Sequence, residues 1–157
     1  MKSIRILLFA FVLAPALLAP HDAFARAPIF SCAIGAKRVL VLKEGSRFVY
    51  HFGAPGRDEL SIVGDPDKGN IFGFSQLYAG PETQIRFVNG GYSFIVYSME
   101  GNTRTGASAV SGLMVLNGGK AVSDASCAPY ASLDGSDDDF GRLPQDTEDY
   151  SAMAVGG

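Results

Sequence analysis

Apolar and polar residues alternate with a period of two over most of the chain between Cys32 and Cys127, and no stretch there has a helical period. Turn-forming residues separate the alternating runs, and Asn89-Gly90-Gly91 is the strongest hairpin signal among them. The predicted strands are residues 37–43, 46–52, 59–63, 71–78, 83–88, 92–97, 113–116 and 120–126. Such a meander closes into a barrel or folds as a sandwich, and both protect the strand edges. We expect an all-β fold, a small antiparallel eight-stranded barrel.

The first 25 residues have the layout of a secretory signal peptide. Lys2 and Arg5 precede an apolar run, residues 6–19, which is shorter than the roughly 20 apolar residues that span a bilayer. Ala23-Phe24-Ala25 is a small-x-small cleavage site, and cleavage after Ala27 is a second option. We therefore expect removal of residues 1–25 and a periplasmic or secreted protein without a membrane span.

Charge divides the remaining chain into two parts. Residues 26–127 carry ten basic and eight acidic side chains, whereas residues 128–157 carry one basic and seven acidic side chains. The second part is also poor in branched apolar residues, a composition typical of disorder. We expect a folded domain over residues 26–127 and an acidic, disordered tail over residues 128–157. Because no basic patch is present, nucleic acid is not an expected partner.

The two cysteines of the chain stand at the two ends of the strand-rich segment. An exported domain of about 100 residues gains from a crosslink, and closing a loop of this length stabilises it by about 4–5 kcal/mol in the chain-entropy model. Cys32 and Cys127 are therefore expected to form one disulfide. The alternatives are two free thiols, a redox-active pair, or a lipid anchor on Cys32, because Ile29-Phe30-Ser31-Cys32 resembles a lipobox.

The sequence lacks the residue patterns of common catalytic and metal sites. His51 is the one histidine after the signal, and no G-x-S-x-G, P-loop or dinucleotide motif is present. One histidine and a bridged cysteine pair cannot supply a zinc site. The aspartates of residues 134–149 do not fit a calcium loop, since Arg142 or Asp139 stands where that loop requires glycine. We expect no catalytic activity, no metal and no cofactor.

Two hairpin segments resemble the bacterial membrane-bound and periplasmic inhibitors of c-type lysozyme. Residues 85–94, Ile-Arg-Phe-Val-Asn-Gly-Gly-Tyr-Ser-Phe, are similar to the central hairpin of that family. Residues 115–122 and Cys127 are similar to its last hairpin and terminal cysteine, and Cys32 is similar to its first cysteine. The resemblance implies an eight-stranded antiparallel barrel with bridged end cysteines, and it implies binding to a lysozyme.

The chain departs from that family at the residues that reach into the lysozyme cleft. The Ser-Gly of the family motif is replaced by Thr83-Gln84, and its Thr-Lys-Gly stretch by residues 97–101, which include Ser98 and Glu100. A carboxylate or a methionine thus stands where the lysine is expected, and a carboxylate there would repel the catalytic carboxylates of a lysozyme. Arg104, in a longer loop, can substitute for the missing cation. The resemblance thus assigns partner binding to Thr83, Gln84, Ser98, Glu100 and Arg104.

These patterns leave two hypotheses for the function. The first is a noncatalytic protein-binding module that inhibits a lysozyme-like hydrolase through the loops at residues 80–83 and 97–104. The alternative is an envelope scaffold or interaction protein that uses the acidic tail as its contact, without lysozyme inhibition. Binding of a small ligand inside the barrel is a third option.

Overall fold

The computed structural model describes residues 28–77, 79–135 and 137–148, so the predicted signal peptide lies outside the described residues. The chain forms nine strands in two antiparallel sheets, each in meander order. The first sheet contains β1 (Phe30–Ile34), β2 (Lys37–Glu44), β3 (Arg47–Ala54) and β4 (Arg57–Gly64). The second sheet contains β5 (Ile71–Leu77), β6 (Pro81–Asn89), β7 (Tyr92–Met99), β8 (Val110–Asn117) and β9 (Lys120–Ser126). The all-β prediction is confirmed.

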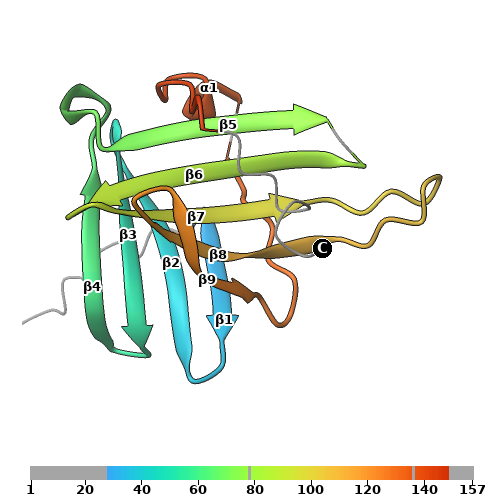
Figure 1. Ribbon diagram of the computed structural model, residues 1–157, viewed down its shortest axis with the longest axis horizontal. Helices are drawn as coiled ribbons and strands as arrows, with labels where there is room; N and C mark the ends of the chain where they lie inside the picture. The colour runs from blue at the N-terminus through green and yellow to red at the C-terminus, as the bar shows by residue number, and fades with distance from the viewer. Residues whose placement is uncertain (1–27, 78, 136, 149–157) are drawn as a thin grey trace, which may run out of the picture.

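The prediction of a single eight-stranded barrel differs from this architecture in two ways. An additional strand, β1, pairs Cys32 with Val39 of β2. The ladder is also interrupted between β4 and β5, so the strands are divided between two sheets, whose directions cross steeply in Figure 1.

The corner between the sheets explains the interruption. The short 3-10 helix η1 (Pro66–Lys68) begins at Asp65, whose side chain accepts a hydrogen bond from the Asp67 amide. It ends at Gly69, which is left-handed with φ 63°. This turn directs β5 away from β4 and into a new sheet. The predicted strands 59–63 and 71–78 leave a turn between them, but the helical form of that turn was not predicted.

The hydrophobic core lies between the facing sides of the two sheets. It includes the fully buried side chains of Val41, Tyr50, Ile85 and Phe87. Tyr50 of β3 reaches the second sheet, where its ring centroid lies 5.5 Å from that of Phe87 and 5.6 Å from that of Phe94. Aromatic side chains therefore join the two layers.

The predicted disulfide is confirmed. Cys32 of β1 and Cys127, just after β9, are bridged across a sequence separation of 95 residues, with their Cα atoms 5.2 Å apart. The bridge thus ties the edge of one sheet to the edge of the other.

The acidic C-terminal segment, residues 128–135 and 137–148, packs against both sheets instead of extending as a disordered tail. The Asp134 amide donates to the Ile29 carbonyl near β1, and the Gly73 amide of β5 donates to the Pro144 carbonyl. Leu133 and Leu143 are buried in the core cluster, and the segment includes the short helix α1 (Asp137–Phe140). A few spaced apolar side chains therefore order a segment whose average composition predicts disorder.

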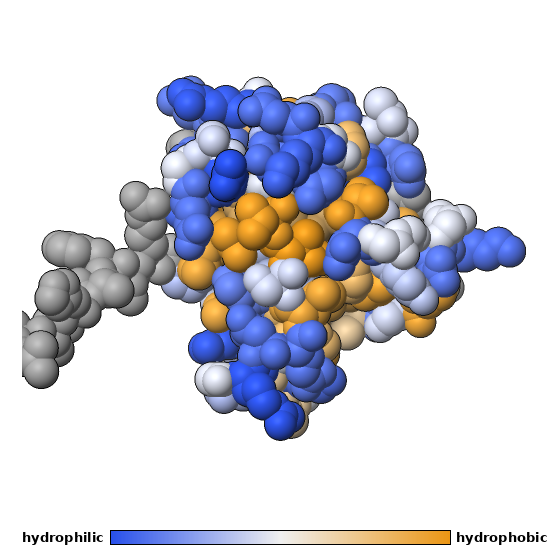
Figure 2. All heavy atoms as spheres, turned by 90° about the vertical axis from the view of Figure 1, so that its left-hand side faces the viewer, coloured by the Kyte–Doolittle hydropathy of each residue, from blue (hydrophilic) through white to orange (hydrophobic). Residues whose placement is uncertain are grey.

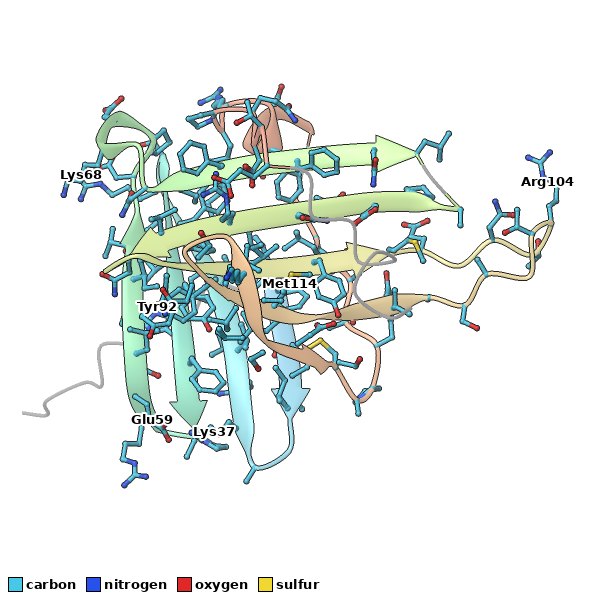
Figure 3. All side chains as sticks on the ribbon, in the orientation of Figure 1. Lys37, Glu59, Lys68, Tyr92, Arg104 and Met114 are labelled. Carbon is cyan, nitrogen blue, oxygen red and sulfur yellow. A yellow bond between two sulfur atoms is a disulfide. The ribbon has the colours of Figure 1, made fainter. Side chains whose placement is uncertain are left out.

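Within the described residues, no helix has the length and apolar character needed to cross a membrane. One side of the molecule is apolar between two polar ends (Figure 2). Tyr92, which lies towards this side in Figure 3, is 41% exposed, and its ring centroid is 6.4 Å from that of the partly buried Phe94.

Candidate functional site

A row of four hydroxyl side chains crosses one end of the second sheet. Ser75 of β5, Thr83 of β6, Ser98 of β7 and Ser111 of β8 are successive cross-strand neighbours. They lie on the same side of the sheet as the core residue Ile85, because residues two apart on a strand share a face. The apolar inner face thus becomes polar at this end.

The C-terminal segment covers half of this hydroxyl row. The Ala131 amide donates to Ser111 Oγ at 2.9 Å, and the Leu133 amide donates to Ser98 Oγ at 3.1 Å. Both serines are buried. Ser98, one of the five predicted partner-binding residues, is therefore engaged inside the protein and is not presented to a partner.

The other half of the hydroxyl row lines an open groove of about 460 Å³. Ser75 and Thr83 form part of one wall, while Ser132 and Gln145 contribute from the C-terminal segment. Glu100 also lines the groove, so the structure brings it together with Thr83, as the two predicted loops suggested.

Gln84, another predicted contact, lies on the opposite face of β6 from Thr83. It is 2% exposed, and its Nε2 donates to Glu82 Oε1 at 2.5 Å. The side chain of Gln84 is therefore part of an internal polar cluster and does not reach the groove.

A projecting arm, residues 100–109, connects β7 to β8 and extends beyond the rest of the molecule (Figure 1). Its tip is ordered by local hydrogen bonds. The Asn102 amide donates to the Ala107 carbonyl, and Asn102 Oδ1 accepts from the Arg104 amide, both at 2.9 Å. Gly106 supplies the left-handed backbone, φ 76°, that closes the turn. Arg104 is exposed at the end of this arm (Figure 3).

The base of the arm is packed against the turn between β5 and β6. The Glu100 amide donates to the Pro81 carbonyl at 2.9 Å. A Cβ atom at Gly80 would lie 2.1 Å from the Glu100 carbonyl oxygen, so only glycine permits this approach. Leu77, which is 81% exposed, ends β5 at the same end of the molecule. The turn, the arm and the groove therefore form one surface.

A buried ion pair, absent from the sequence predictions, anchors the far end of the C-terminal segment. Arg86 of β6 donates from Nε and Nη2 to the two carboxylate oxygens of Asp146, each at 2.7 Å. The guanidinium also stacks over the Phe72 ring, 4.2 Å from its centroid. An arginine inside an otherwise apolar strand, Ile85-Arg86-Phe87, was the available sequence signal, but the sequence did not identify which carboxylate pairs with it.

His51 lies on the outer face of β3 and forms a hydrogen bond with Asp58 of β4, with Nδ1 2.6 Å from Oδ2. Over residues 28–77, 79–135 and 137–148, no cluster of three or more His, Cys, Asp or Glu side chains could hold a metal ion. The best-developed polar site is therefore the groove beside Thr83, with the arm next to it.

No family model matches the chain, and neither a curated protein nor a solved structure matches it.

Proposed function

We propose that this chain is an exported, noncatalytic protein-binding module that inhibits a lysozyme-like hydrolase through its projecting arm. The observation that carries the proposal is the position of Arg104, a solvent-exposed cation at the tip of an ordered loop. It is also the one charged residue between Gly101 and Ala109.

Glycoside hydrolases of this kind carry two catalytic carboxyl groups in an open cleft. A guanidinium binds carboxylates with two parallel hydrogen bonds, which makes Arg104 a suitable group to enter that cleft. The hydrogen bonds of Asn102 hold the tip in one conformation, and a preorganised loop loses less entropy on binding. Glu100 lies at the base of the arm, so its negative charge is set back from the contact.

This proposal limits the inhibitory contact to part of the residue set that the family resemblance implies. Ser98 and Gln84 are engaged in internal hydrogen bonds, so we assign partner binding to the arm and to the adjacent Thr83. The alternative contact, a free acidic tail, has less support because residues 128–135 and 137–148 pack on the sheets. The disulfide and the predicted signal support export.

The test is titration of the purified protein into muramidase assays with c-, g- and i-type lysozymes. We expect inhibition of at least one type, and we expect Arg104→Ala to weaken it about 10- to 100-fold, the range for a lost charge-assisted hydrogen bond. Arg57→Ala, at an exposed position at the start of β4, is the matched control and should inhibit like the wild type. Absence of inhibition across all three types, or full inhibition by Arg104→Ala, contradicts the proposal.

A further inference from the structure

We propose that the groove beside Thr83 is a saccharide-binding site, which takes a short neutral or N-acetylated oligosaccharide. The groove is defined by Ser75 and Thr83 on the sheet, Glu100 at the base of the arm, and residues 132–135, 140–141 and 145 of the C-terminal segment. Its volume of about 460 Å³ falls within the range of small-molecule sites, roughly 300–1,000 Å³.

The walls of the groove carry the groups that recognise sugar hydroxyls. Ser75, Thr83 and Ser132 each supply a hydroxyl that donates and accepts hydrogen bonds, and Gln145 supplies an amide that does both. The carboxylate of Glu100 is an acceptor only. Vicinal sugar hydroxyls present donors and acceptors side by side, so this mixture of neutral groups and an acceptor matches them.

The same groove has an apolar component. Leu133, which is buried, and Phe140, which is partly buried, line it together with the polar groups. The C–H face of a pyranose ring is apolar and packs on such surfaces, whereas its rim of hydroxyls requires polar partners. Gly73 and Gly135 also line the groove, and their lack of side chains leaves the space in which Leu143 and Phe140 pack.

Charge excludes two other classes of ligand. No Lys, Arg or His is among the described residues that line the groove, so phosphorylated and other anionic ligands find no cation there. Its acidic residues, Glu100 and Asp134, are both exposed, and exposed carboxylates bind a cation weakly because water screens the charge. The less exposed lining is neutral: the Thr83 hydroxyl, Leu133 and Phe140. A polyhydroxylated ligand fits this distribution better than a polyamine does.

The C-terminal segment of the chain already binds two of the four side chains in the hydroxyl row. Ser98 and Ser111 belong to the same hydroxyl row, but backbone amides of the C-terminal segment occupy them. Among the described residues, no backbone amide of the segment hydrogen-bonds to the hydroxyl of Ser75 or Thr83, although both line the groove together with Ser132 and Gln145. Two hydroxyls of the row therefore already bind the extended backbone of the C-terminal segment. The other two remain open to a ligand with similar polar groups. This inference does not depend on the proposed inhibition.

The experiment is a titration of ¹⁵N-labelled protein, followed by two-dimensional NMR, with triacetylchitotriose, maltotriose and spermidine in separate samples. We expect saturable shifts with at least one of the saccharides, centred on the backbone amides of Ser75, Thr83, Ser132 and Gly135. Spermidine should leave these amides unshifted. The assay contains no hydrolase, so its result is separate from that of the muramidase assay.

Two variants with matched controls test the lining residues. Thr83→Val and Glu100→Gln should each weaken saccharide binding about 3- to 10-fold, the effect of one lost hydrogen bond. Thr103→Val on the arm and Glu44→Gln at the end of β2 are exposed and outside the groove, and both should bind like the wild type. Absence of shifts with both saccharides overturns the proposal, as does a saturable response to spermidine alone or wild-type affinity in both groove variants.

Discussion

The buried pair between Arg86 and Asp146 offers the sharpest test of how the C-terminal segment is held. The side chains of these residues are only 8% and 2% exposed, and two hydrogen bonds of 2.7 Å join them. Asp146→Asn preserves the shape but removes the negative charge of this pair, although the guanidinium of Arg86 stays buried. Breaking such a pair costs about 3–5 kcal/mol. We therefore expect the free energy of unfolding to decrease by this amount. If release of residues 137–148 from the sheets requires less free energy, we expect that release instead.

Urea unfolding and amide hydrogen exchange distinguish these two outcomes. A global loss lowers the midpoint of unfolding at constant m-value, whereas local release speeds exchange at the Gly73 and Asp146 amides, which hydrogen-bond across the same contact. The control is Glu59→Gln, which breaks the exposed pair with Lys37 and should change stability by less than about 1 kcal/mol.

The double variant Arg86→Met/Asp146→Leu keeps buried side chains at both positions but removes both charges. Because neither charge remains, its stability should return to within about 1 kcal/mol of the wild type or exceed it. The reasoning is refuted if Asp146→Asn costs less than about 1 kcal/mol and leaves hydrogen exchange at Gly73 unchanged.

Two further predictions follow from the core and the disulfide. Replacing Cys32 and Cys127 with Ala removes a crosslink between residues 95 apart and should lower the free energy of unfolding by about 4–5 kcal/mol; alkylation of the unreduced wild type, checked by mass, should modify neither cysteine. Tyr50 is fully buried, and its hydroxyl has no hydrogen-bond partner in the described structure, so Tyr50→Phe should be neutral or stabilising by up to about 2 kcal/mol in urea unfolding. Burial raises the pKa of Tyr50 above its ordinary value near 10, so the unfolded state ionises first. The contribution of neutral Tyr50 to the free energy of unfolding is complete below about pH 10 and decreases above it. In Tyr50→Phe, the decrease of the free energy of unfolding with pH should therefore be smaller by about 1.4 kcal/mol per pH unit; an unchanged pH dependence contradicts this.

Local patterns were sufficient for most of the strands. The hairpin at Asn89-Gly90-Gly91 pairs β6 with β7 as predicted, because its two glycines adopt positive φ and the flanking runs alternate. β1 escaped prediction because it is five residues long and includes small side chains, Ser31 and Ala33, on its exposed face. β1 pairs with β2 across a two-residue turn at residues 35–36, where Gly35 has a positive φ.

The candidate site was less accessible to sequence reasoning than the strands. Thr83 and Glu100 were both predicted to contact a partner, and the structure places them in the lining of the same groove. Ser98 was predicted on equal grounds, yet it accepts a hydrogen bond from Leu133, 35 residues later in the chain. Nothing local to Ser98 distinguishes it from an exposed hydroxyl, so only the path of the C-terminal segment determines which hydroxyls remain open.

Residue pattern alone therefore established the all-β class, the turns and the crosslinked pair of cysteines, since each depends on neighbours in the chain or on the only possible pairing. The division into two sheets, the position of the C-terminal segment and the Arg86–Asp146 pair were decided in three dimensions. Composition averages over a segment, whereas burial depends on individual side chains. Leu133 and Leu143 gain a surface to bury against only after the two sheets have formed.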